Sequence, residues 1–365
     1  MPCRRDGGRV ATAMALNTAA LTLDGPHAAV DVQALGGMLG PATFRLPDGR
    51  TLSPMYRAPW HGETGLHLDD SPLLRYLNGD WLCAPFGPTT PPSDLPLGWA
   101  TRADGAFDAD RGCDHGWTAN HPWTLVGRDD SKLHLAIEPP PDHVLARVER
   151  VVHLVATHPG VDVVTTLHPR RDATVPVALH PTFAVPAGGV ELRPGPCRAI
   201  HAYPVAPVPG VSRLHPGGRA ATLGALPATD GTTLDLRRLP LPGDTEELLQ
   251  LEDVQPPFTL RWRQDSSETN RDAAAIDLVL DWDADTLPDL MLWVSQRGRK
   301  HAPWNGRNVA LGVEPCASCF DLTRVADPAS DHPLAKRRGV VLRAGAPLAL
   351  RWSLRARAVG PDRRP

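Results

Sequence analysis

Prolines and glycines are spread along the whole chain, and they limit its possible folds more than any other feature. The 365 residues include 40 prolines and 32 glycines. A proline inside a helix removes a backbone hydrogen bond and clashes with the preceding turn. Prolines and glycines together interrupt most of the chain at intervals too short for a helix of three or more turns. The sequence therefore predicts a low helix content.

Apolar and polar residues alternate in several segments, as they do in strands with one buried face. Between positions 276 and 283 isoleucine, leucine and tryptophan alternate with aspartate, and segments 258–263 and 348–355 follow the same pattern. Segments 148–155 and 161–167 are rich in β-branched residues and flank a Thr-His-Pro-Gly turn, which predicts a hairpin.

One segment carries a helix signal. Asp244 is a suitable N-cap, and Glu247 stands three residues later. The apolar residues Leu248, Leu249, Leu251 and Val254 follow before Pro256. Many short strands with few short helices predict an all-β fold, a large antiparallel β-sandwich. We expect a loosely ordered tail over residues 1–25 and one sandwich domain over residues 26–365.

The charge balance and hydropathy exclude several classes of partner. The net charge is -3, which gives no broad basic surface for nucleic acid or an anionic membrane. No apolar run reaches the roughly 18 residues that a transmembrane helix needs. The first 23 residues imitate a signal peptide only faintly, because Asn17 and three threonines interrupt the apolar part. We therefore expect a cytoplasmic protein.

The six cysteines are too sparse for a disulfide framework, so we expect reduced thiols. Cys316 and Cys319 have CxxC spacing, but no second CxxC or histidine pair accompanies them at zinc-finger distances. The tryptophan-cysteine context of a thioredoxin-like centre is missing too. The favoured interpretation is two buried thiols that pack as small apolar residues. A proline-rich stretch at 85–96 predicts a long ordered loop near a functional rim.

Two histidines and one glutamate stand in unusual local contexts. His115 precedes a glycine, and His180 lies between an apolar run and a proline, so the backbone around each imidazole is restricted. Such a histidine can donate a proton into a cleft, or it can simply bond its own turn. Glu314 interrupts an apolar strand before a proline, where a carboxylate must be paired, neutral or facing a polar cavity. A salt bridge to a nearby arginine is the alternative.

The segment before this glutamate has side chains suited to binding a sugar. Trp304, Asn305 and Arg307 supply an aromatic face, an amide and a guanidinium. Tryptophan is the commonest aromatic residue of the chain, and Trp117, Trp123, Trp293 and Trp304 are the candidates for lining a carbohydrate cleft. They lie close in sequence to the motifs.

The ordered motifs His115-Gly116, His180-Pro181-Thr182-Phe183 and Gly312-Val313-Glu314-Pro315 resemble the aldose 1-epimerase, or galactose mutarotase-like, family. The resemblance covers about residues 70 to 355. It implies an antiparallel β-supersandwich that interconverts the α and β anomers of aldoses without metal or cofactor. It also implies that Glu314 takes the proton of the C1 hydroxyl, that His180 protonates the ring oxygen, and that His115 binds the sugar.

The chain departs from the family pattern at two binding residues. The asparagine-arginine pair that precedes the first histidine is not visible, and Arg75 or Arg111 would have to replace it. The binding aspartate between His180 and Glu314 has no clear match, with Asp253 and Asp289 as candidates.

Two other functions are compatible with these residues. A non-catalytic sugar-binding or sensor protein would use the same cleft. A glycoside hydrolase or lyase on a related sandwich is the other, although a hydrolase ordinarily uses two carboxylates.

The charge of the sugar is a separate hypothesis. Arg297, Arg299, Lys300 and Arg307 cluster before Glu314, and such a group can bind a carboxylate or phosphate on the substrate. The favoured alternative is that they form a solvated charged face. The sequence indicates a small-molecule sugar as the partner and leaves its charge and the oligomeric state open.

Overall fold

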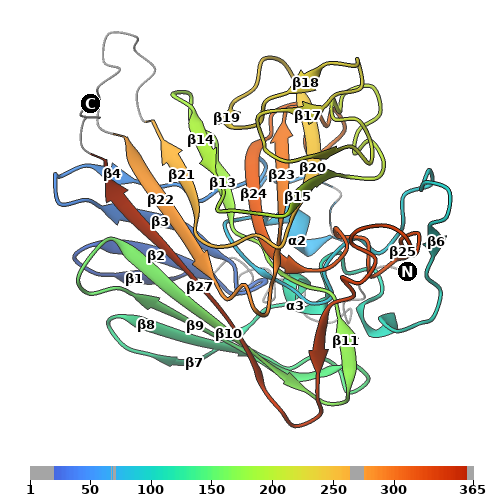
Figure 1. Ribbon diagram of the computed structural model, residues 1–365. Coiled ribbons are helices and arrows are strands. Elements are labelled where there is room, and N and C mark those ends of the chain that lie inside the picture. The colour runs from blue at the N-terminus through green and yellow to red at the C-terminus, as the bar shows by residue number, and fades with distance from the viewer. Residues whose placement is uncertain (1–19, 67, 69–70, 264–274, 360–365) are drawn as a thin grey trace.

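The computed structural model describes residues 20–66, 68, 71–263 and 275–359, and this part of the chain is nearly all antiparallel β-structure (Figure 1). Its helices have four residues or fewer. They are α2 (Pro72–Arg75), the 3-10 helix η1 (Asp108–Asp110) and α3 (Trp117–Asn120). The prediction of an all-β fold with few short helices is therefore confirmed.

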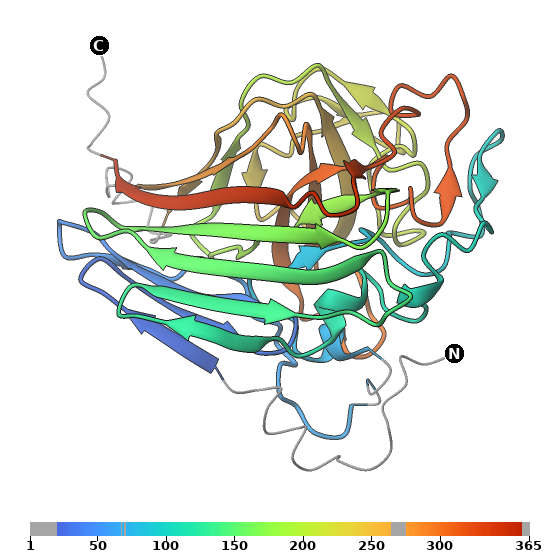
Figure 2. The same ribbon diagram turned by 90° about the horizontal axis from the view of Figure 1, so that it is seen from below.

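A nine-stranded sheet forms the larger layer, and its outer face meets solvent. In spatial order its strands are β19 (Arg238–Leu239), β14 (Val190–Arg193), β21 (Phe258–Trp262), β22 (Ile276–Trp282), β27 (Leu348–Ala358), β10 (Gly160–Pro169), β9 (Leu145–Leu154), β8 (Lys132–Ile137) and β7 (Thr124–Arg128). The strands from β27 to β7 lie side by side in Figure 2. Along β9 and β22 fully buried residues alternate with more exposed ones, because successive side chains point to opposite faces.

An eight-stranded sheet forms the second layer and is buried on both faces at its centre. Its strands are β16 (Arg219–Ala220), β15 (Ala199–Ala202), β20 (Thr245–Glu252), β23 (Asp289–Gln296), β24 (Val309–Ala317), β12 (Val177–Leu179) and β5 (Leu82–Cys83), and β13 (Thr182–Ala184) also pairs with β24. Every residue of β23 is buried, and so is every residue of β24 except Val309. This sheet therefore has no solvent-facing side at its middle strands.

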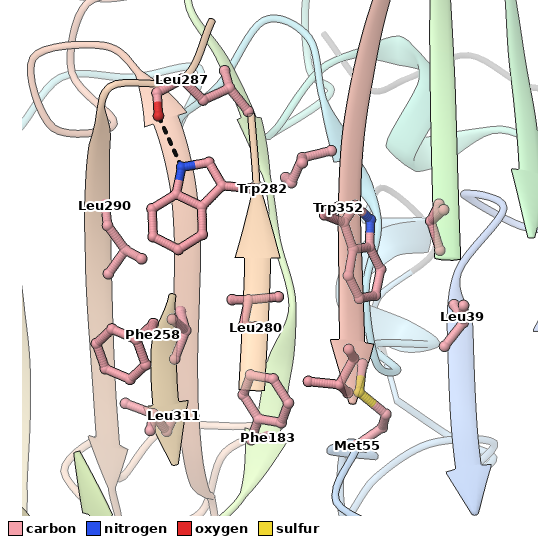
Figure 3. Packing of buried hydrophobic residues seen from close by; sticks show 14 of the residues in the cluster. Leu39, Met55, Phe183, Phe258, Leu280, Trp282, Leu287, Leu290, Leu311 and Trp352 are labelled. Carbon is pink, nitrogen blue, oxygen red and sulfur yellow. Dashed lines mark hydrogen bonds between the residues drawn. The ribbon is translucent and has the colours of Figure 1, made fainter. Parts of the chain in front are cut away.

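The main core fills the space between the two large sheets. Figure 3 shows Leu290 and Leu311 of the eight-stranded sheet beside Phe258, Leu280 and Trp282 of the nine-stranded sheet. These five side chains are at most 5% exposed, and the indole of Trp282 donates a hydrogen bond to the carbonyl of Leu287. A second cluster, which includes Trp60, Trp81 and Phe320, covers the opposite face of the eight-stranded sheet.

Smaller sheets complete the fold. The first consists of β1 (Ala20–Asp24), β2 (Ala28–Gln33), β3 (Leu39–Arg45) and β4 (Thr51–Leu52). The two-stranded ones are β11 (Ala173–Val175) with β26 (Val340–Leu342), β17 (Leu226–Pro227) with β18 (Thr233–Leu234), and β6 (Ala100–Thr101) with β25 (Ala326–Asp327). Most of the predicted tail, residues 1–19, lies outside the described residues. Residues 20–24 of that predicted tail form β1, which pairs with β2 along its length. The assignment of one domain stays a prediction.

The segments in which apolar and polar residues alternate form strands, as the sequence predicted. The three alternating segments correspond to β21, β22 and β27, and the predicted hairpin is the antiparallel pair β9 and β10. The proline-rich stretch 85–96 contains no strand or helix.

The predicted helix after Asp244 is wrong, because residues 245–252 form the strand β20. Asp244 does not cap a helix, since its carboxylate pairs with Arg297 and Lys300. Seven of the eight residues of β20 are buried, on both faces. The leucine-rich segment consequently shows no alternation, and its apolar spacing imitates that of a helix.

The buried-thiol interpretation of Cys316 and Cys319 agrees with the structure, where both are free and buried. The general expectation of reduced thiols is wrong for Cys113, which is disulfide-bonded. The cytoplasmic location stays a prediction. Among the described residues, no helix is long and apolar enough to cross a membrane.

Candidate functional site

A cavity of about 220 Å³ opens on the face of the eight-stranded sheet that lies away from the main core. Its walls include the two histidines and the glutamate that the sequence singled out, His115, His180 and Glu314. Three tryptophans line it as well, Trp81, Trp293 and Trp304. Residues far apart in the chain therefore meet in one concave site.

The strand register explains why Glu314 faces this cavity. On β24 the side chains of Leu311 and Val313 enter the main core, so the side chain of Glu314 points to the opposite face, which Gly312 shares. Gly312 is paired with Trp293 on β23 and leaves room for the carboxylate. A Cβ atom at position 312 would lie 2.3 Å from Glu314 Oε1.

His180 lies in the short connection between β12 and β13, and its side chain reaches the same cavity. Both strands pair with β24, on either side of Glu314, and the carbonyl of Pro181 accepts a hydrogen bond from the amide of Val313. The backbone amide of His180 donates to the carbonyl of Trp81, and its imidazole stacks on the Trp81 indole at 4.0 Å between ring centroids. The imidazole is thereby fixed against the wall.

His180 and Glu314 form a close buried pair. His180 Nε2 lies 3.2 Å from Glu314 Oε1, at an angle that departs from hydrogen-bond geometry, and this buried oxygen has no hydrogen-bond partner among the described residues. The Thr182 hydroxyl donates to the carbonyl of His180, so its oxygen is available to accept from His180 Nδ1, 3.1 Å away. In neutral His180 the lone pair of Nε2 then faces the carboxyl group.

Burial shifts the pKa values of this pair toward their neutral forms. Desolvation, with the charge of Asp321, raises the pKa of Glu314 well above its usual value. Desolvation, with the neighbouring imidazole of His115 as a smaller cause, lowers the pKa of His180 well below its usual value. Over a wide pH range the pair therefore holds one proton, which these shifts place on Glu314.

His115 lies against this pair and is also neutral. Its ring is 5.4 Å from the His180 ring and perpendicular to it, and its Nδ1 lies 3.4 Å from the thiol of Cys83. Desolvation lowers the pKa of His115 to about 4. The backbone has φ 60° at His115 and φ 89° at Gly116, where a Cβ would lie 2.5 Å from the carbonyl oxygen of Ala84. The glycine after His115 is therefore a steric requirement.

The opposite wall combines aromatic rings with a guanidinium. Arg299 lies over the Trp304 ring, 4.5 Å from its centroid, and its Nε is 2.9 Å from a carboxylate oxygen of Glu246. The indole of Trp293 donates to the same carboxylate at 2.7 Å. The positive charge of Arg299 is thus largely balanced by a fully buried acid.

The cavity is also lined by two carboxylates that the sequence analysis did not propose as site residues, Asp114 and Asp321. Asp114 accepts hydrogen bonds from the amide and hydroxyl of Thr89. Asp321 accepts one from the hydroxyl of Tyr203 at 2.7 Å. Asp321 lies in the turn after β24 and belongs to none of the quoted motifs, so no sequence signal marked it.

Four residues predicted to bind substrate do not line the cavity. Arg307 is paired with Glu63, and Asn305 is exposed in the preceding turn. Asp253 is paired with Arg198 and Arg337, and Arg75 packs over the ring of Tyr76. Of the six residues predicted to bind substrate, only Trp304 and His115 reach the cavity wall.

The alternative candidates lie outside the lining too. Asp289 is buried beside Arg337 and Gln250, and Arg111 is an exposed partner of Asp108. Trp117 stacks on His121 and Trp123 is in the main core. Within the described ranges, no three histidine, cysteine, aspartate or glutamate side chains gather in a way that could hold a metal ion.

Comparison with known proteins identifies the fold. No family model matches the sequence, and no curated protein matches it. A candidate aldose 1-epimerase from Escherichia coli K12 shares 15% sequence identity with a TM-score of 0.57, covering 93% of this chain and 99% of that one. An aldose epimerase homologue from C. elegans shares 11% identity with a TM-score of 0.56, covering 94% and 100%. A galactose mutarotase-like protein from Lactobacillus casei ATCC 334 shares 14% with a TM-score of 0.54, covering 93% and 100%.

Proposed function

Starting from the aldose epimerase-like fold of this chain, we propose that the protein interconverts the α and β anomers of an aldose by general acid–base catalysis. The observation that carries the proposal is the buried pair of His180 and Glu314 on the cavity wall, whose Nε2 and Oε1 atoms lie 3.2 Å apart. Mutarotation requires a base that takes a proton from one oxygen and an acid that delivers a proton to a second oxygen. A pair that holds one proton supplies the base and the acid together.

The geometry of the pair suits the two oxygens of a hemiacetal. The C1 hydroxyl oxygen and the ring oxygen are bonded to the same carbon, so the base and the acid must be neighbours. Glu314 Oε1 and His180 Nε2 are 3.2 Å apart. Transfer of the Glu314 proton to His180 Nε2 first gives the ionised form of the pair. Glu314 then accepts the hydroxyl proton, His180 protonates the ring oxygen, and the bond from C1 to the ring oxygen breaks to give the open-chain aldehyde.

The return steps complete the anomer exchange. After rotation about the C1–C2 bond, the hydroxyl that was the ring oxygen attacks the other face of the aldehyde. His180 takes its proton and Glu314 returns a proton to the C1 oxygen, so the pair regains its starting state. Each group is expected to contribute on the order of 10² to 10⁴ in rate. Proton transfers alone accomplish this reaction, so the chemistry requires no redox cofactor.

The remaining walls support binding of a neutral sugar. His115 is a neutral hydrogen-bonding group beside the pair, and Trp304 offers an aromatic face. Of the four basic residues before Glu314, Arg297 and Lys300 pair with Asp244, and Arg307 pairs with Glu63. Arg299 reaches the cavity with its charge balanced by Glu246. A neutral aldose therefore fits better than an anionic one.

Two-dimensional exchange NMR on the anomeric protons of free aldoses tests the proposal. We expect cross-peaks between α and β signals to grow in with catalytic amounts of protein, and neutral hexoses to exchange faster than hexose phosphates or uronates. Binding without faster exchange would support a sugar sensor instead. Cleavage of an oligosaccharide would support a hydrolase.

A further inference from the structure

Asp321 is a half-buried carboxylate on the cavity wall that the acid–base chemistry does not use. It follows β24 in the chain, and with Asp114 and Glu314 it is one of three carboxylates that line the cavity within the described residues. We propose that Asp321 binds sugar hydroxyls and determines which aldoses the site accepts. The inference rests on the proposed function and adds to it a residue for substrate specificity.

Backbone contacts fix the conformation of the turn that carries Asp321. Phe320 has φ 50°, and its amide donates to the side-chain carbonyl of Gln250 at 2.5 Å. The backbone of Asp321 lies directly against Gly87, where a Cβ would come within 1.8 Å of the Asp321 carbonyl oxygen. The carboxylate therefore has a fixed position relative to the cavity before any ligand arrives.

The hydrogen bond to Tyr203 leaves Asp321 with acceptor capacity. Tyr203 is buried, and its hydroxyl donates to Oδ1 of Asp321 at 2.7 Å. A carboxylate has about four acceptor positions, so this bond occupies one of them. The hydroxyl groups of a sugar are donors that match the remaining positions, and hydrogen bonds to a charged acceptor are the stronger class.

The charged neighbours of Asp321 distinguish it from the other two carboxylates. The titratable or charged groups whose interactions with Asp321 are resolved are Tyr203, Asp114, Arg299, Glu314, Cys83 and Cys319. Asp114 is exposed and already accepts two hydrogen bonds from Thr89. Glu314 is assigned to the proton transfer. Of the three carboxylates, Asp321 is consequently the one that can accept a hydrogen bond from a sugar hydroxyl in the cavity.

A series of monodeoxy aldoses tests the assignment in the intact protein. For each sugar, the quench of tryptophan fluorescence gives Kd, and exchange NMR gives kcat and KM. In the wild type we expect one monodeoxy analogue to bind about 10- to 100-fold more weakly than its parent sugar. The Asp321→Asn variant should bind the parent sugar more weakly than the wild type does, by a similar factor. Removal of that hydroxyl from the sugar should then reduce the affinity of the variant little further.

A second readout depends on charge and would not respond to a purely structural role. The negative charge of Asp321 raises the pKa of Glu314, so Asp321→Asn should move the alkaline limb of kcat to lower pH. The matched variant Tyr203→Phe keeps the carboxylate and should retain the selectivity for the same hydroxyl. If Asp321→Asn fails to fold, Tyr203→Phe still decides, because selectivity that moved to another hydroxyl would contradict the assignment.

The failure of this inference is distinguishable from the failure of the proposed function. If the wild type exchanges anomers and Asp321→Asn keeps both KM and the monodeoxy pattern, Asp321 is not the specificity residue and the epimerase proposal stands. If the wild type neither binds nor exchanges any aldose, both proposals fall.

Discussion

The two large sheets place the same residue type in opposite electrostatic states. On the nine-stranded sheet, Glu149 in β9 lies on the solvent side, and hydrogen bonds from Arg147 and His168 outweigh desolvation and lower its pKa. On the eight-stranded sheet, desolvation dominates at Glu314 and raises its pKa well above the usual value. A carboxylate becomes a stronger base only where water is excluded and no cation is paired with it.

This difference explains why the candidate site lies on the sheet that is buried on both faces. The nine-stranded sheet has one face in the main core and the other in water, so a charged group on its outer face is either hydrated or ion-paired. The central strands of the eight-stranded sheet have a core on one face and the cavity on the other. Catalytic groups there are desolvated by the fold itself.

The largest expected effect follows from replacing the two glutamates in parallel. Glu314→Gln should lower the anomeric exchange rate by about 10² to 10⁴, because the amide is nearly isosteric and cannot accept the C1 proton. Glu149→Gln removes the same charge from the other sheet and should leave the rate unchanged. Exchange NMR on both variants, with circular dichroism to verify folding, makes the comparison. Equal rates in the two variants would exclude Glu314 as the base.

The pH profile should show that the acid and the base act together. The pair gains a second proton only below the lowered pKa of His180, and it loses its last proton only above the raised pKa of Glu314. The wild-type rate should therefore be bell-shaped, with a plateau wider than unperturbed histidine and glutamate would give.

His180→Asn should lower the rate by about 10² and change the shape of this profile. Without the imidazole only ionised Glu314 remains, so the residual rate should rise with pH through the pKa of Glu314 and show no alkaline decline. Sugar affinity should change little, since the amide still hydrogen-bonds the ring oxygen. If the variant keeps the alkaline limb and a normal rate, His115 becomes the acid to test.

Alanine substitutions at two glycines, one on each large sheet, compare the packing of the two sheets and should have a smaller effect. In Gly312→Ala the new Cβ would lie 2.3 Å from Glu314 Oε1, so the carboxylate must shift, and overpacking should destabilise the protein by about 1–3 kcal/mol. In Gly127→Ala, on β7, nothing lies within 4 Å of the new Cβ, and the change should stay within about 0.5 kcal/mol. Thermal unfolding and exchange rates check both. Equal stability of the two variants would show that the cavity floor is not close-packed.

The smallest effect is expected at Cys83, whose thiol contacts His115 Nδ1 at 3.4 Å. Cys83→Ala should lower kcat/KM roughly threefold, because the imidazole loses a weak hydrogen-bonding partner that helps to orient it. Cys197→Ala, at a thiol outside the cavity lining, is the matched control and should have no effect. A loss shared by both variants would indicate general destabilisation instead.

The same contrast between the sheets determines what could be predicted from the sequence. Strands β21, β22 and β27 were predictable because one face of each is more exposed, which makes their alternation visible. Strand β20 was taken for a helix because both of its faces are buried. His180 and Glu314 were found from their short motifs, and the structure brings them together. Asp321 could not be found, since its position depends on the pairing of distant strands and a turn without a motif.

The central claim is that His180 and Glu314 act as one unit, and a double-mutant cycle measured by anomeric exchange tests it most directly. Residues that act as a unit lose most of their joint effect when either is removed. We predict that the wild type accelerates exchange, and that the double variant Glu314→Gln with His180→Asn is no more than a few-fold slower than the slower single variant. Losses that multiply in the double variant, or a wild type without acceleration, would contradict the account.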